Sequence, residues 1–122
     1  MKLYESSEDY LERILILTEK NGSVRSIDIV SDMNFSKPSV SVAMKKLREN
    51  GYIEIDNKGL ITLTKSGYEI ASKTYERHRV LTDLFIALGV DEEVAKNDAC
   101  RVEHDISEET FKAIKDHLNN LK

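Results

Sequence analysis

Residues 26–64, SIDIVSDMNFSKPSVSVAMKKLRENGYIEIDNKGLITLT, contain the pattern that decides the fold. Two short helical patterns come first, separated by the turn Asn34-Phe35-Ser36. Ser26 and Ser36 are the predicted N-caps, because a serine hydroxyl accepts a hydrogen bond from an amide of the first helical turn. Pro38 suits the start of the second helix, where its missing N–H has no partner to lose. The two helices predict a helix-turn-helix motif.

The period changes from helical to alternating after Asn50-Gly51. Residues 52–56 alternate apolar and polar side chains, residues 57–59 form a turn, and residues 60–64 are rich in β-formers. This pattern predicts a two-stranded antiparallel hairpin. A hairpin directly after the second helix of a helix-turn-helix motif is the wing of a winged-helix domain.

Four further helices are expected outside this stretch. They cover Glu5–Asn21, Gly67–Leu88 with Ser66 as its cap, Asp91–His104, and a final helix that follows Ser107. The expected fold class is therefore mainly α, with an N-terminal winged helix-turn-helix in residues 1–66. Residues 67–122 are expected to form a helical domain, whose acidic and amphipathic last two helices are typical of a dimerisation module.

Composition limits the function classes. Of 122 residues, 40% are hydrophobic and 33% are charged, and the net charge is −4. The longest apolar run is far shorter than the roughly 20 residues that a bilayer requires, and acidic residues occupy the place of a signal-peptide core. The single cysteine favours a reducing cytoplasm. Residues 21–90 carry ten bases and eight acids, so a basic patch on an acidic protein is expected.

Three groups of side chains could carry chemistry. Cys100, Glu103 and His104 have the i, i+3, i+4 spacing of one helix face, which suits a metal site. The alternative interpretation is a small buried cysteine beside a surface Glu–His pair. Asp9 and Glu12 also share a helix side, although Glu19 and Lys20 on that side favour a solvated face. His78 lies on an apolar stripe, where a satisfied core histidine is the alternative.

Several motifs in this order resemble the diphtheria-toxin-repressor family of metal-dependent transcriptional repressors, specifically its short manganese-transport-regulator branch. The resemblance covers essentially the whole chain. It is carried by residues 8–12, residues 36–41, residues 59–67, the pair Arg77-His78 and residues 100–104.

The resemblance implies that residues 67–122 form a helical metal-binding and dimerisation domain, and it implies the metal ligands of the chain. They are Asp9, Glu12, His78, Cys100, Glu103 and His104. The manganese branch usually has a carboxylate at the position of Cys100, and the iron branch usually has methionine at the position of Asp9. Carboxylates and imidazoles suit Mn²⁺, whereas a thiolate shifts selectivity toward Fe²⁺, Co²⁺ or Zn²⁺. Fe²⁺ is the first choice and Mn²⁺ the second, with Zn²⁺ or Co²⁺ expected to bind in vitro.

DNA is the expected partner of the helix-turn-helix. Hydroxyl and basic side chains on the second helix and the wing are suited to phosphates or base edges. The candidates are Arg25, Ser36, Lys37, Ser39, Ser41, Lys45, Lys46 and Lys58. Solvated lysines and capping serines are the alternative interpretation for individual members of this set.

The predicted function is a cytoplasmic, homodimeric repressor that senses Fe²⁺ or Mn²⁺, binds a palindromic operator and controls metal homeostasis genes. It is not expected to be an enzyme. One alternative is a winged-helix regulator with a non-metal signal, such as oxidation of Cys100. The other is a small Zn²⁺ hydrolase that uses His78, Glu103 and His104, which would need a substrate pocket and a general base.

Overall fold

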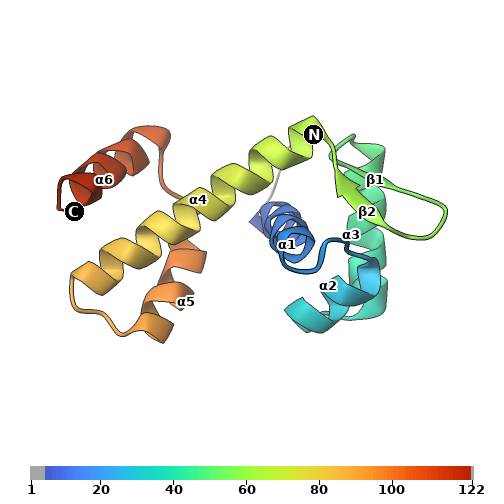
Figure 1. Cartoon of the computed structure of the whole chain (residues 1–122), viewed down its shortest axis with the longest axis horizontal. Coiled ribbons are helices and arrows are strands. Elements are labelled where there is room, and N and C mark those ends of the chain that lie inside the picture. Colours follow the sequence, from blue (N-terminus) through green and yellow to red (C-terminus); the bar gives the residue numbers. More distant parts are fainter. Residues whose placement is uncertain (1–4, 122) are drawn as a thin grey trace. The chain divides into compact units, whose positions relative to one another are not determined.

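The computed structural model describes residues 5–121. Within them it contains six helices and a two-stranded sheet (Figure 1). The elements are α1 (Glu5–Asn21), α2 (Ser26–Met33), α3 (Lys37–Glu49), β1 (Ile53–Ile55), β2 (Ile61–Leu63), α4 (Lys65–Ala87), α5 (Glu92–Val102) and α6 (Glu108–Asn120). The predicted fold class, mainly helical with an N-terminal winged helix, is confirmed.

The chain divides into two compact units. Unit 1 is Met1–Ser72 and unit 2 is Lys73–Lys122, so the division falls inside α4. Unit 1 contains the winged helix and the first part of α4, and unit 2 contains the rest of α4 with α5 and α6.

The helix-turn-helix of unit 1 consists of α2 and α3. Ser36 caps α3, because its Oγ accepts a hydrogen bond from the amide of Ser39 at 3.2 Å. The prediction that Ser26 caps α2 is wrong. Arg25 is the N-cap residue, and its amide donates to Oδ2 of Asp28 at 2.8 Å. Asn34 ends α2 in the left-handed conformation with φ 56°, which produces the tight turn between the two helices.

The wing is the antiparallel pair β1–β2, with Ile53 opposite Leu63 and Ile55 opposite Ile61. Its turn is fixed by Asp56, whose Oδ1 accepts from the amides of Lys58 and Leu60 at 2.8 and 2.9 Å. Asparagine or aspartate side chains often stabilise turns in this way. The predicted hairpin is confirmed, and its turn presents the side chain of Lys58 to solvent.

The first turn of α4 packs directly on the backbone that precedes β1. A Cβ atom at Gly67 would lie 2.0 Å from the carbonyl oxygen of Tyr52, so only glycine fits this approach. The hydroxyl of Thr64 accepts from the amide of Gly67 at 3.2 Å. Thr64 therefore caps α4 in place of the predicted Ser66, which lies inside the helix.

The core of unit 1 is built from apolar side chains of α1, α2, α3 and the wing. Leu11, Ile14, Ile29 and Val40 are fully buried. The apolar stripe of α1 faces this core as its helical spacing predicts. Ile27 and Val42 of the motif do not join it, because they remain 51% and 55% exposed.

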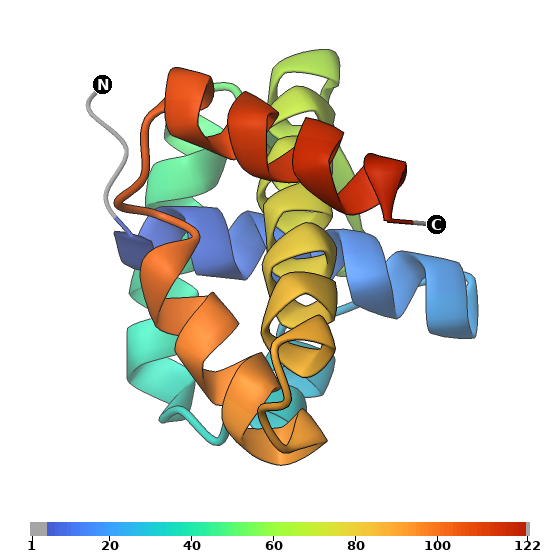
Figure 2. The ribbon, with the colours of Figure 1, turned by 90° about the vertical axis from the view of Figure 1, so that its left-hand side faces the viewer.

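Unit 2 consists of residues 73–87 of α4 with α5 and α6 beside them (Figure 2). Ser107 caps α6, because its Oγ accepts from the amide of Thr110 at 3.1 Å. Helix α5 is shorter at both ends than the predicted Asp91–His104. Asp91 is its N-cap and Glu103 its C-cap, so His104 lies in the connection to α6.

None of the helices formed by residues 5–121 is both long and apolar enough to span a bilayer.

Candidate metal centre and nucleic-acid interface

A buried carboxylate lies between two imidazole rings in unit 2. Nδ1 of His78 on α4 lies 2.9 Å from Oε2 of Glu103. Nε2 of His104 lies 3.4 Å from Oε1 of the same carboxylate. The side chain of Glu103 is 0% exposed and that of His104 is 3% exposed. Three of the predicted ligands therefore come together within this unit.

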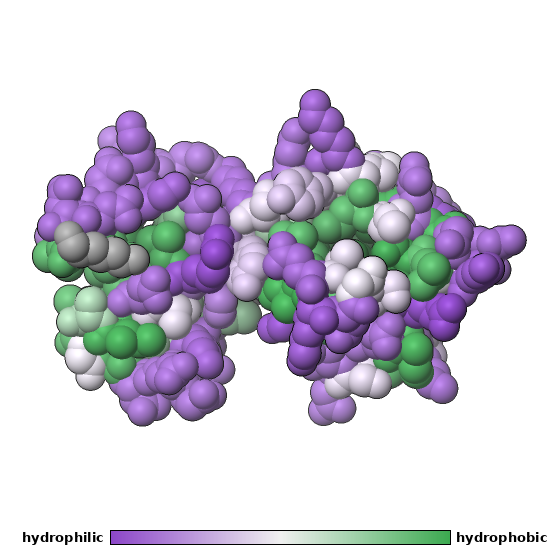
Figure 3. Space-filling view, in the orientation of Figure 1, coloured by the Kyte–Doolittle hydropathy of each residue, from purple (hydrophilic) through white to green (hydrophobic). Residues whose placement is uncertain are grey.

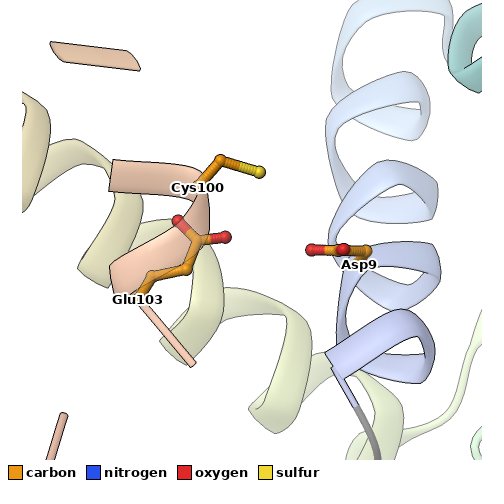
Figure 4. Close-up of side chains that lie close together, drawn as sticks. All are labelled: Asp9, Cys100 and Glu103. Atoms are coloured by element: carbon orange, nitrogen blue, oxygen red, sulfur yellow. The ribbon is translucent and has the colours of Figure 1, made fainter. Parts of the chain in front are cut away.

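The thiol of Cys100 lies at the same end of α5. Its Sγ and a carboxylate oxygen of Glu103 are within 4.8 Å of each other. The side chains of Cys100 and Glu103 leave α5 on the same side (Figure 4). The alternative of a surface Glu–His pair beside a buried cysteine is wrong, because Glu103 is buried and Cys100 is of intermediate exposure.

The two predicted ligands of unit 1 lie on α1. Glu12 is only 4% exposed, and Asp9 is of intermediate exposure. Glu19 and Lys20, two to three turns further along α1, are exposed. The interpretation of Asp9 and Glu12 as members of a solvated face is therefore wrong for Glu12. A buried carboxylate needs a partner or a proton to offset the loss of hydration.

Arg77 is a residue of unit 2 for which sequence patterns predict no role. Its side chain is 9% exposed, and Nη1 donates to the carbonyl oxygens of Glu103 and Ile106 at 3.1 and 2.9 Å. Nη2 donates to Oε1 of Glu108 at 3.2 Å. The one hint of a role in the sequence is that Arg77 directly precedes the candidate ligand His78. On a helix, neighbouring residues point in different directions, so a shared role was not apparent.

Glu108 also pairs with Lys73. The hydrogen bond from Lys73 and its positive charge, with a smaller effect of Arg77, hold the pKa of the Glu108 carboxyl below its ordinary value of 4.5. This exposed ion pair connects α4 to the first turn of α6.

The predicted DNA-contacting residues are all exposed on unit 1. The set is Arg25, Ser36, Lys37, Ser39, Ser41, Lys45, Lys46 and Lys58. They lie at the start of α2, along α3 and at the wing, and hydrophilic residues cover the end of the wing in the space-filling view (Figure 3). Their exposure is compatible with DNA contact.

An open hollow of about 230 Å³ lies on unit 1 between α2, α3 and β1. It is lined by Ser26, Ser41, Met44, Lys45, Arg48 and Ile55. Two cations and two hydroxyls at one hollow are suited to a phosphate group. Arg48 was missed as a candidate contact, although its position three residues after Lys45 places both on one side of α3.

Unit 2 exposes several large apolar side chains. Ile86, Leu88, Val94 and Leu121 are between 43% and 72% exposed. Figure 3 shows apolar surface on this unit among hydrophilic residues. Surfaces of this kind often take part in subunit association.

An exposed basic helix-turn-helix in one unit and a cluster of metal-donor side chains in the other define the class of protein, a DNA-binding regulator that responds to a metal. The model of the iron dependent repressor N-terminal DNA binding domain matches residues 2–61. The model of the iron dependent repressor metal binding and dimerisation domain matches residues 64–122. The chain belongs to the iron-dependent repressor family, which confirms the resemblance and the predicted metal-dependent transcriptional regulation.

Individual relatives agree with this family. An uncharacterised helix-turn-helix transcriptional regulator of Methanocaldococcus jannaschii is 33% identical over 97% of this chain and 96% of its own length. The transcriptional regulator MntR of Escherichia coli is 34% identical over 91% of this chain and 72% of its own.

A solved structure also matches. A manganese-dependent transcriptional repressor in complex with manganese is 27% identical, with a TM-score of 0.84, over 93% of this chain and 52% of that chain. The present chain therefore spans about half the length of that protein. The matched relatives are named as regulators rather than as enzymes.

Proposed function

We propose that this chain represses metal homeostasis genes by binding operator DNA in response to Fe²⁺ or Mn²⁺. The observation that carries the proposal is the carboxylate of Glu103, buried between His78 and His104 with the thiol of Cys100 close by. The buried metal donors lie in unit 2 and the exposed basic surface lies in unit 1. Metal sensing and DNA binding therefore use different parts of the chain.

The donors fit a divalent transition metal. Two imidazoles, a carboxylate and a thiol are ligands for Fe²⁺, Co²⁺ or Zn²⁺, and the carboxylate and imidazoles also suit Mn²⁺. Cys100 is the reason to place Fe²⁺ first, whereas the manganese in the matched repressor structure favours Mn²⁺. When bound, either ion supplies the positive charge that a buried carboxylate requires.

We propose that Asp9 and Glu12 complete this ligand set from α1. Their carboxylates and that of Glu103 repel one another when they share a site, so a metal-free state holds α1 weakly. A bound metal ion offsets this repulsion between carboxylates, as the family resemblance implies. Useful switching requires the metal to favour the DNA-binding state by a few kcal/mol.

The partner is double-stranded DNA with a palindromic operator. The family has both a DNA-binding and a dimerisation domain, and a homodimer presents two recognition helices related by twofold symmetry. The exposed hydroxyl and basic residues of α3, with Arg25 and Lys58, supply phosphate and base contacts. Because its partner is DNA, we place the protein in the cytoplasm.

Anaerobic fluorescence anisotropy with DNA from the upstream region of its own gene tests this function. Addition of Fe²⁺ or Mn²⁺ to the metal-free protein is expected to tighten binding at least tenfold, and a steep loss of affinity with salt is expected from the phosphate contacts. His104→Ala is expected to abolish the metal effect.

Two results would contradict the metal signal. Equal affinity with and without metal would leave a winged-helix regulator whose signal lies elsewhere. A response to peroxide that Cys100→Ser removes and His104→Ala leaves intact would assign the signal to oxidation of the thiol.

A further inference from the structure

Arg77 is a buried cation that does not belong to the ligand set. It precedes His78 on α4, yet its guanidinium lies against the segment that follows α5. Only 9% of its side chain is exposed. Arginine is almost always charged in proteins, so a buried guanidinium needs hydrogen-bond partners. Nη1 and Nη2 of Arg77 both donate, whereas Nε has no hydrogen-bond partner among the described residues.

The guanidinium binds the backbone of residues 103–106, the segment that carries the candidate ligands Glu103 and His104. Nη1 donates to the carbonyl oxygen of Glu103 at 3.1 Å and to that of Ile106 at 2.9 Å. Glu103 is the C-cap of α5, where carbonyl oxygens lack helical partners. One nitrogen thus holds both ends of the segment that contains His104.

The same guanidinium also binds the start of α6. Nη2 donates to Oε1 of Glu108 at 3.2 Å, and Cζ lies 5.3 Å from the ring centroid of Phe111, which is itself 8% exposed. A cation over an aromatic face is attracted by the ring quadrupole. Arg77 therefore joins α4 to both sides of the α5–α6 connection.

These contacts fix the backbone from which two candidate ligands project. The carboxylate of Glu103 lies against His78, and His104 follows it in the chain. A small rotation of the Glu103 peptide would move the carboxylate and the imidazole together, and ligand sets tolerate such displacement poorly.

We propose that Arg77 is a positioning residue that sets the conformation of residues 103–106 for metal binding before any metal arrives. This inference rests on the proposed function, because it assigns a role toward that site. The planar fork of arginine is required, since a lysine ammonium is a point donor on a flexible stem and does not reproduce the same pattern of donors.

Arg77→Lys keeps the positive charge but removes the planar set of guanidinium donors. Arg79→Lys is the matched control. Arg79 lies on the same helix, is exposed and stacks over Tyr75 at 4.7 Å. Anaerobic Co²⁺ titration measures affinity and the visible absorption bands. Hydrogen–deuterium exchange of the metal-free protein measures the amides of residues 103–107.

Arg77→Lys is expected to weaken Co²⁺ binding at least tenfold, change the absorption bands and speed exchange of residues 103–107 at least fivefold. Arg79→Lys is expected to match the wild type in each measurement. Wild-type Co²⁺ affinity, bands and exchange in Arg77→Lys would overturn the proposal. So would a lower midpoint of thermal unfolding with unchanged Co²⁺ affinity, because that result describes a merely structural residue.

The two proposals fail in different ways. If the wild-type protein binds no Co²⁺, Fe²⁺ or Mn²⁺, the proposed function is wrong. The exchange of residues 103–107 in the metal-free variants still decides whether Arg77 sets their conformation.

Discussion

The two units differ in what they bury. Unit 1 contains most of the buried apolar side chains, from α1, α2, α3 and the wing, and Glu12 is its one buried charged residue among those described. Unit 2 buries fewer apolar side chains and includes Arg77 and Glu103 within its interior. Its small core, with Ala95 and Ala99 on α5, leaves room for polar groups.

This difference predicts that the apolar core of unit 1 supplies most of the folding stability and that unit 2 responds to metal. An apolar core gains free energy that depends little on pH or ions. A buried carboxylate and guanidinium are stable only with their partners in place, so we expect the interior of unit 2 to respond to a bound metal ion. Unit 1, which carries the proposed DNA-binding surface, is therefore expected to be rigid. Unit 2 is expected to become more stable when it binds a metal ion.

Leu47→Ala tests the apolar side of this comparison and has the largest expected effect. Leu47 is 1% exposed in the core of unit 1, and truncation of a buried leucine costs about 2–5 kcal/mol of unfolding free energy. Urea unfolding measures this loss. Val42→Ala on the exposed face of α3 is the control, with an expected change below about 0.5 kcal/mol. Equal losses in both variants would contradict the assigned core.

Glu103→Gln tests the buried polar groups of unit 2, because glutamine has nearly the same volume as glutamate but carries no charge. Loss of the central ligand is expected to weaken Fe²⁺ or Mn²⁺ binding about 100-fold or more, equivalent to about 2.8 kcal/mol. Metal should then no longer raise the thermal unfolding midpoint, which for the wild type rises with metal concentration. Wild-type metal affinity in this variant would remove Glu103 from the site.

Lys45→Ala and Arg48→Ala test whether unit 1 contacts DNA through the hollow beside α3. Each side chain lines the hollow beside α3, and each is expected to weaken DNA binding and reduce the slope of log affinity against log salt by about 1. Lys112→Ala on exposed α6 is the control in unit 2. An unchanged slope in the two variants would show that the hollow faces away from DNA.

Glu108→Gln has the smallest expected effect and concerns pH. Lys73, and to a lesser degree Arg77, lowers the pKa of the Glu108 carboxyl. A lowered pKa contributes stability at neutral pH that is lost as pH falls through the folded-state value. The wild type is therefore expected to exceed the variant in unfolding free energy at neutral pH, and to approach it in acid below the ordinary value of 4.5. A constant difference at all pH values would contradict this ion pair.

Most of the fold could be predicted from the sequence because its signals are local. Hydrophobic period, the turn at Asn34 and the alternation on both sides of Gly59 specify helices and hairpin within a few residues. The helix starts were less predictable. Ser26 and Ser66 are suitable caps by type, but backbone conformation places Arg25 and Thr64 at the cap positions.

The candidate site was only partly predictable. Helical spacing connected Cys100, Glu103 and His104, because their separation is local. The contact between His78 and Glu103 joins residues 25 positions apart and the role of Arg77 depends on backbone carbonyl groups. Neither follows from spacing, since tertiary packing determines which surface of α4 meets the end of α5.

The most direct test of the central claim is reciprocal linkage between metal and DNA. Anaerobic Mn²⁺ or Fe²⁺ affinity is measured for the full chain with and without saturating operator DNA. If the metal strengthens DNA binding, DNA must strengthen metal binding by the same factor. DNA is expected to strengthen metal binding at least tenfold in the wild type and not at all in Glu103→Gln. Identical metal affinities with and without DNA would show that the sensing cluster and the winged helix are not coupled.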